Sequence, residues 1–224
     1  MFGLDDWVAH FSDGTTVAFV IAVAAVLGLR HATDPDHLTA VTTLVAARRD
    51  RAAGAAVRLG AAWGAGHATS LFAFGVPIVL YRAYLPEPVQ AAAETTVGLM
   101  IVALALWLLV RWHRGHTHGR RLRARSTRQA LVVGLVHGMG GSAGVGVLLL
   151  ATIQSRLLAI AALALFAVCT AGSMALLTMG WGVTLASPRV QRRFDRLAPL
   201  LGVASLTFGA WYSLGALSLA PYYL

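Results

Sequence analysis

Long apolar runs recur along almost the whole chain, and short polar segments separate them. A helix needs about 20 apolar residues to cross a hydrocarbon core roughly 30 Å thick. The runs leave no room for a separate soluble domain, so we expect one all-α transmembrane domain over residues 1–224. They predict six membrane-spanning helices, at about residues 15–47, 54–81, 90–112, 129–152, 156–187 and 196–219.

Composition supports a multi-pass membrane protein. Hydrophobic residues make up 58% of the chain, charged residues only 12%, and the mean hydropathy is +0.70. The opening MFGLDDWVAHFSDG is acidic and aromatic, so we expect no cleaved signal peptide. Cys169 is the only cysteine, which excludes an internal disulfide and a dithiol relay.

The net charge of +9 comes entirely from arginine, and the arginines gather in alternate loops. Three clusters, within residues 48–58, 111–128 and 189–196, hold most of them. Basic loops mark the cytoplasmic side of a membrane protein. We therefore expect a protein of the cytoplasmic (inner) membrane with both termini outside, in which the arginines flank the lipid bilayer and bind no nucleic acid.

The first span is too long for one straight crossing. A helix over residues 15–47 would measure about 50 Å at 1.5 Å per residue. Its centre carries LRHATDPDHLTA, in which Pro35 disfavours helical geometry at Asp34 and suits the first turn of a new helix. The sequence predicts a helix broken at this stretch, with Asp34 as the N-cap of its second part.

A second interruption is expected in the fourth span, where LVHGMGGSAGVG packs five glycines between Gly138 and Gly146. Each half of the chain has three expected spans, about 15–112 and 129–219, joined by a basic, His-containing cytoplasmic loop over 113–128. An odd number of spans makes the two halves enter the membrane from opposite sides, which predicts a 3+3 inverted-topology repeat with interrupted first and fourth spans. No repeat is visible residue by residue, so the symmetry rests on topology alone.

The first break carries candidate ligands for a divalent transition metal. Imidazole and carboxylate together suit nickel, cobalt, zinc or copper, and His31, Asp36 and His37 supply both groups. On a continuous helix the two histidines would lie about 120° apart, an obstacle that the break removes. Asp34 could cap the helix, act as a further ligand or support a ligand through a hydrogen bond, and we expect Arg30 to be a charge partner of an aspartate.

The second span adds His67, in LGAAWGAGHATSLFAFG. It follows Gly60 and Gly64, whose spacing lets another helix approach closely. A lone intramembrane histidine can be hydrogen-bonded to a neighbouring helix, but beside a second polar cluster we expect a ligand.

Other polar positions are weaker candidates. In the glycine-rich stretch of the fourth span they are His137, Met139 and Ser142, and in the basic loop, where a His-rich tract can hold metal loosely, they are His113, His116 and His118. Glu94 is expected to be interfacial.

The stretch RHATDPDH resembles the H-x4-D-H signature of the nickel/cobalt permeases, and GHATS is similar to the histidine stretch of their following span. HGMGGSAG is most similar to the shorter, urease-accessory-type branch of that group. The resemblance covers roughly residues 28–75 and implies secondary transport of Ni²⁺ or Co²⁺. It also implies that His31, Asp36, His37 and His67 recognise the metal.

Two other functions would use the same residues. An intramembrane hydrolase could hold a zinc ion on the histidines, but no additional acid or base is evident once the ligands are assigned. An anion or sulfur-compound exporter could use half-helix N-termini and Arg30, although the aspartates of the break oppose an anion. We therefore expect a metal transporter rather than an enzyme, with no resident cofactor. The preferred metal, the direction, the coupling ion and the oligomeric state stay open.

Overall fold

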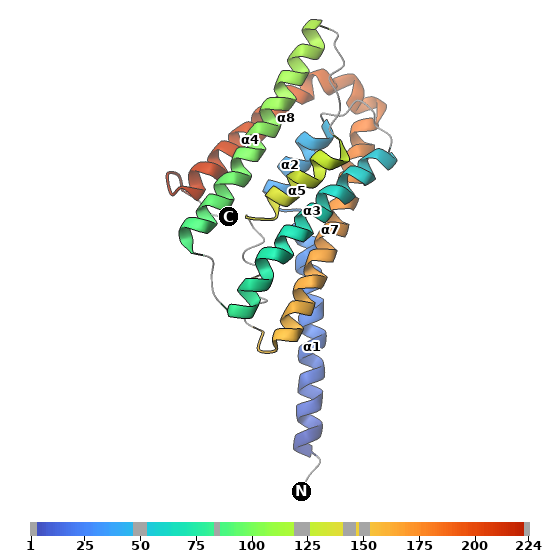
Figure 1. Ribbon diagram of the computed structural model, residues 1–224. Coiled ribbons are helices and arrows are strands. Elements are labelled where there is room, and N and C mark those ends of the chain that lie inside the picture. The colour runs from blue at the N-terminus through green and yellow to red at the C-terminus, as the bar shows by residue number, and fades with distance from the viewer. Residues whose placement is uncertain are drawn as a thin grey trace.

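The computed structural model describes residues 4–46, 53–82, 86–118, 126–140, 147 and 153–221. Within these ranges every regular element is a helix and no strand occurs. The expected all-α class is therefore confirmed. The helices are α1 (Leu4–His31), α2 (Pro35–Ala46), α3 (Ala53–Tyr81), α4 (Glu87–His118), α5 (Thr127–His137), α7 (Arg156–Ala186) and α8 (Pro188–Ala216), as labelled in Figure 1.

Four of these helices are long and apolar enough to cross a membrane. Their candidate spans are Gly54–Tyr81, Glu87–Arg114, Arg156–Leu185 and Arg196–Ala216. A fifth candidate is the pair Val17–His31 and Pro35–Val45, which bends by 46° at a short break. The described residues thus contain four or five candidate spans, and the expected six are not all seen.

The fourth expected span is only partly described. α5 has 11 residues and would measure about 16 Å, too short to cross a bilayer alone. It ends at His137, where the glycine-rich stretch begins, and Gly138–Gly140 form a turn. The rest of the expected span, 141–152, lies outside the described residues except for Val147.

Helix boundaries agree closely with the apolar pattern for α3 and α7. α4 continues past residue 112 to His118, so the expected loop over 113–128 begins as helix. The apolar run predicts only the part of a helix inside the bilayer, because a helix satisfies its own backbone hydrogen bonds and can continue into water with polar side chains.

Large apolar side chains cover the outside of the bundle. Phe19, Val26, Leu157, Val168 and Leu200 are each more than 60% exposed. A water-soluble monomer rarely shows so much apolar surface, whereas a lipid-facing surface requires it. The exposed side chains therefore agree with a membrane protein.

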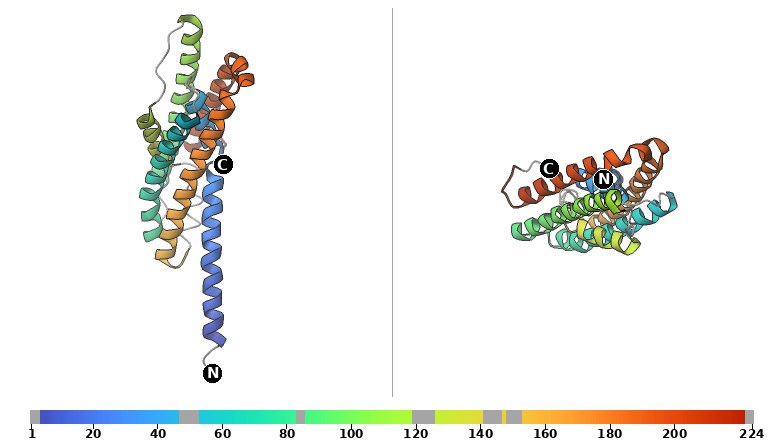
Figure 2. Two further views of the ribbon diagram at one scale, coloured as in Figure 1. Left: turned by 90° about the vertical axis from the view of Figure 1, so that its right-hand side faces the viewer. Right: turned by 90° about the horizontal axis from the view of Figure 1, so that it is seen from above.

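The helices pack mainly as pairs. α3 lies against α7 and α5, α4 lies against α8, and α1 lies against α7 (Figure 1). α3 and α7 run antiparallel, as do α4 and α8, and the N-terminal part of α1 extends beyond the other helices (Figure 2). α1 and α5 enter the bundle from opposite ends, and both end near its middle (Figure 1).

Small residues allow the closest approaches between these helices. A Cβ atom on Gly64 would lie 2.8 Å from the carbonyl oxygen of Ala171, where α3 meets α7. Where α4 meets α8, a Cβ on Gly98 or on Gly209 would lie 3.1 Å from the carbonyl oxygen of the other. Close packing of backbones is how membrane helices gain contact where lipid offers no hydrophobic advantage.

Candidate metal centre

The break between α1 and α2 positions the first histidines. The last turn of α1 closes with backbone hydrogen bonds from Thr33 to Arg30 (2.8 Å) and from Asp34 to His31 (3.1 Å). Pro35 then begins α2, as the sequence predicts, and Leu38 N–H donates to the Asp34 carbonyl at 3.0 Å. The chain changes direction here, so His31 and His37 face each other with ring centroids 4.5 Å apart.

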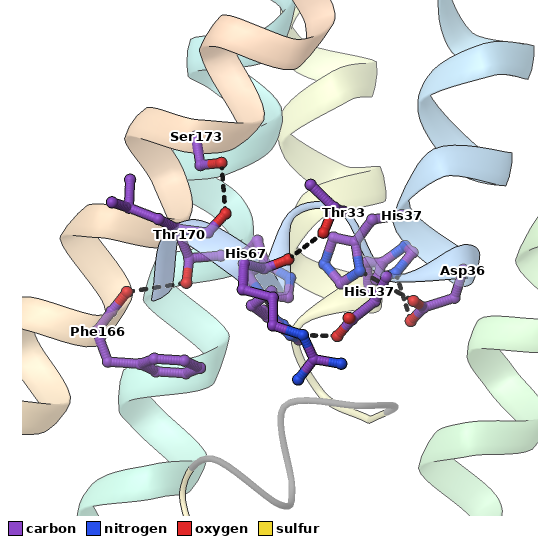
Figure 3. A network of polar contacts seen from close by, with 12 residues as sticks. Thr33, Asp36, His37, His67, His137, Phe166, Thr170 and Ser173 are labelled. Carbon is purple, nitrogen blue, oxygen red and sulfur yellow. Dashed lines mark hydrogen bonds and ion pairs between the residues drawn. The ribbon is translucent and has the colours of Figure 1, made fainter. Parts of the chain in front are cut away.

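Four histidines from four helices meet beside this break. His31 closes α1, His37 lies in the first turn of α2, and His67 and His137 come from α3 and α5. Figure 3 labels His37, His67 and His137. Five ring pairs have centroids 4.3–5.9 Å apart. Each histidine is at most 4% exposed, and Asp36 beside them is 2% exposed. We call these five residues the histidine cluster.

Two carboxylates hold three of the rings. Asp34 Oδ2 lies 2.9 Å from His31 Nδ1. Asp36 joins two helices, since its Oδ1 lies 3.0 Å from His37 Nδ1 and its Oδ2 lies 3.1 Å from His137 Nε2 (Figure 3). The fourth ring contacts another histidine, with His31 Nε2 and His67 Nε2 3.2 Å apart.

Several ring nitrogens of the cluster are buried without a hydrogen-bond partner among the described residues. They are His37 Nε2, His67 Nδ1 and His137 Nδ1. A buried polar atom without a partner costs about 1–3 kcal/mol, so native proteins seldom retain one without a use. Three such nitrogens in one cluster indicate a site for a ligand.

The geometry suits a metal ion. Two overlapping groups, His31 with His37 and His67, and Asp36 with His37 and His137, each place one ligand atom per residue within 4.8 Å of the others. Two nitrogens bound to one ion at about 2.0–2.1 Å would lie roughly 3.0–3.4 Å apart. The 3.2 Å between the Nε2 atoms of His31 and His67 falls in that range.

Aromatic rings form part of the wall of the cluster. Phe166 lies 5.5 Å from His31 between ring centroids, and Trp63 lies 5.9 Å from His137 and 5.8 Å from His37. The sequence reasoning did not single out either ring. The sequence carries one signal for these rings, which is their spacing. Phe166 stands four residues before Thr170, Trp63 stands four residues before His67, and both polar side chains are buried.

The other candidate residues lie elsewhere or outside the described part. Met139 is half-buried in the turn after α5, Arg30 is exposed, and His113 is exposed on α4. Ser142 and the side chains of His116 and His118 lie outside the described residues. The carboxylates of Asp34 and Asp36 pair with histidines, and the role of Arg30 as their charge partner stays a prediction. Glu94, expected at the interface, is 9% exposed and accepts from Gln90 at 3.0 Å.

Comparison with known proteins agrees with the resemblance seen in RHATDPDH. The family model NicO, described as high-affinity nickel-transport protein, matches residues 17–137, more than half of the chain. This range contains the whole histidine cluster. The urease accessory protein UreH of Bacillus sp. (strain TB-90) is 25% identical, over 89% of this chain and 92% of that protein. No solved structure matches the chain.

Proposed function

The chain belongs to the NicO family of high-affinity nickel-transport proteins, and from this premise we propose that it carries Ni²⁺ or Co²⁺ through the histidine cluster. The family is one of metal-ion transporters, so the protein is not an enzyme. One observation carries the choice of route. Four imidazoles and a carboxylate lie fully buried at a helix break, with three ring nitrogens lacking partners among the described residues.

The donor set supports a borderline transition metal. Imidazole nitrogen suits nickel, cobalt, zinc and copper, whereas magnesium and calcium prefer oxygen. Ionisable groups buried at membrane depth are costly and usually mark a transport path. The similarity to a urease accessory protein over most of both chains supports the shorter branch of the permeases.

The two alternatives have less support. A zinc hydrolase would need an acid or base in addition to the ligands, and a transporter family gives no reason to expect one. An anion exporter would need positive charge at the break, but Asp34 and Asp36 lie there and Arg30 is exposed.

We infer further that the two halves form a 3+3 inverted repeat. The ends of α1 and α5 support this, because they share the motif Gly-Leu-x-His: GLRH over 28–31 and GLVH over 134–137. Each motif glycine packs on the opposite half. A Cβ on Gly28 would lie 2.5 Å from the Phe166 carbonyl oxygen of α7, and one on Gly134 would meet the Trp63 carbonyl oxygen of α3.

The contacts between α3 and α7 support the same symmetry. His31 lies on Phe166 as His137 lies on Trp63, so Phe166 and Trp63 occupy corresponding places. The same interval along the chain relates Gly60 to Leu163 and Gly75 to Thr178. The Gly60–Thr178 and Gly75–Leu163 contacts then become copies of each other.

No repeat is visible in the sequence residue by residue, and this correspondence supports one from the contacts. The motif is only four residues long and escapes notice in the sequence, because glycine and leucine are common and the intervening residue differs. Contacts with the opposite half give the glycine and the histidine of each motif a common role. In the proposed symmetry α1 and α5 approach the cluster from opposite membrane faces, and the arginine clusters support an inside position for the start of α5.

Transport is tested by reconstituting the purified protein in liposomes and measuring the uptake of nickel and cobalt isotopes, with and without a pH gradient. We expect uptake by the wild type, none by His37→Gln, and normal uptake by the matched control His113→Gln, whose ring is exposed on α4. Folding is checked by monodisperse elution in detergent. If no divalent ion moves under either condition, or if His37→Gln transports normally, the proposed route is wrong.

A further inference from the structure

We propose that Asp34 and Asp36 do not bind the transported ion but orient the histidines that do, so that the ligands are imidazole nitrogens. This inference rests on the proposed function of the histidine cluster. It follows from which atom of each carboxylate faces which atom of each ring.

An ionised carboxylate only accepts hydrogen bonds, so the ring nitrogen that faces it must carry the proton. Asp34 Oδ2 thereby places the proton of His31 on Nδ1, at 2.9 Å. Asp36 does the same for two rings, at His37 Nδ1 (3.0 Å) and His137 Nε2 (3.1 Å). In a neutral imidazole the other nitrogen is then a lone pair available to a metal.

His31, His37 and His67 each place one ring nitrogen within 4.8 Å of the other two, and His137 belongs to a second group with Asp36 and His37. His31 Nε2 faces His67 Nε2 at 3.2 Å, a separation suited to two ligands of one ion. His37 Nε2 and His137 Nδ1 are buried and have no hydrogen-bond partner among the described residues. His67 has no carboxylate contact among its described hydrogen bonds, so its proton can occupy the nitrogen that the metal does not use.

Asp36 connects the two halves of the chain, because its two carboxylate oxygens face rings from different halves. Oδ1 holds a ring of α2 and Oδ2 holds a ring of α5. Metal-bound histidines commonly donate their other N–H to a carboxylate, which fixes the ring and strengthens the ligand. A set of neutral imidazoles favours nickel, cobalt, copper or zinc and discriminates against magnesium and calcium, which need oxygen ligands.

The alternative is that Asp36 is itself a ligand, together with His37 and His137. Asp36→Asn separates the two. An amide has one accepting oxygen and a donating NH₂ group, so it can hold one ring as the carboxylate does but forces the other to present a lone pair toward the NH₂. That second ring would change tautomer and cease to be a ligand. If Asp36 bound the ion directly, all the rings would still bind.

The first measurement is ¹⁵N NMR of metal-free protein labelled at histidine, with each ring assigned from single His→Gln variants. We expect protons on Nδ1 of His31 and His37 and on Nε2 of His137 in the wild type, and a changed tautomer of His37 or His137 in Asp36→Asn. His113 is the internal control and should be the same in both proteins. Unchanged tautomers of both rings in Asp36→Asn would overturn the positioning role.

The second measurement is nickel-edge X-ray absorption of Ni²⁺-loaded protein, in which scattering from the outer ring atoms counts the imidazoles. We expect at least three in the wild type, fewer in His37→Gln and Asp36→Asn, and nickel affinity about 10–100-fold weaker in Asp36→Asn. Two imidazoles with oxygen ligands in the wild type would overturn this inference alone. A nickel ion with no imidazole would instead remove the proposed transport site. The wild-type spectra decide the matter even where a variant does not fold.

Discussion

The ends of α1 and α5 have the same local construction but supply different chemistry. Both end in Gly-Leu-x-His, with the glycine against the backbone of the opposite half and the histidine beside an aromatic ring. After His31 the chain turns through Asp34, Pro35 and Asp36 to His37, whereas His137 is followed by a glycine-rich turn. The first half thus contributes three histidines and Asp36 to the cluster, and the second half contributes one histidine.

The same contrast recurs between α3 and α7. In the proposed repeat, His67 on α3 corresponds to Thr170 on α7, because they stand four residues after Trp63 and Phe166 respectively. Thr170 is buried, and its hydroxyl donates to the Phe166 carbonyl of its own helix at 2.8 Å. Two halves with corresponding contacts can therefore share the packing while one half carries most of the ligands. Packing needs small residues at both crossings, but a single ion needs only one set of donors.

The largest effect is expected in a test of membrane topology, because an inverted repeat requires the two halves to enter the membrane from opposite faces. In a Cys169→Ala background, cysteines at residues 118 and 191 should resist a membrane-impermeant thiol reagent in intact cells, and one at residue 86 should react. Permeabilised cells provide the control, in which all three should react. The reverse pattern in intact cells would place the termini inside.

His67 and Thr170 sharpen the comparison at the level of chemistry. His67→Gln should weaken nickel binding by more than the roughly 10–100-fold that is typical when a hydrogen-bond partner of a metal ligand is lost, because it removes a ligand nitrogen. Thr170→Val should change nickel affinity little, because its hydroxyl bonds only within its helix among the described contacts. Equilibrium dialysis with nickel isotope on monodisperse protein measures both. Equal losses would show that the second half contributes to the site at this position too.

Gly28 and Gly134 test the shared packing. Replacing either with alanine forces a Cβ into the backbone of α7 or α3 and should destabilise the fold by about 1–3 kcal/mol. Gly172→Ala is the matched control, since nothing lies within 4 Å of its added Cβ and alanine favours a helix. Thermal unfolding in detergent should show a lower midpoint for the first two variants only. If the midpoint of one of these variants is unchanged, the helix end that carries this glycine packs less closely on the opposite half than the other helix end does.

The smallest effect is expected at Asp34. Asparagine keeps an accepting oxygen for His31 Nδ1–H and caps a helix about as well as aspartate, but it loses the charge. Asp34→Asn should therefore weaken nickel binding by about tenfold or less, at the low end of the range for losing a hydrogen-bond partner of a metal ligand. Isotope uptake and dialysis measure it beside Asp36→Asn. A loss as large as that of Asp36→Asn would mean that the two carboxylates act alike.

The sequence by itself determined the class of the protein and the place of its unusual residues. Apolar runs predict α3 and α7 nearly to the residue, because burial in lipid demands long uninterrupted hydrophobic helices. Pro35 predicts the start of α2, because proline fits a first helical turn and restricts the residue before it. The family resemblance also follows from local residues, and the match over residues 17–137 confirms it.

Only the tertiary structure decided which polar groups meet, because hydrogen bonds between helices join residues far apart in the chain. The sequence makes His137 a weaker candidate ligand in another span but does not say which group it meets, and its side chain lies 3.1 Å from that of Asp36 across 101 positions. The Gly-Leu-x-His motif likewise acquires meaning only when each glycine is seen against the opposite half. A hydrophobic pattern records how deeply each segment is buried, but the direction in which a buried side chain points depends on the helices packed around it.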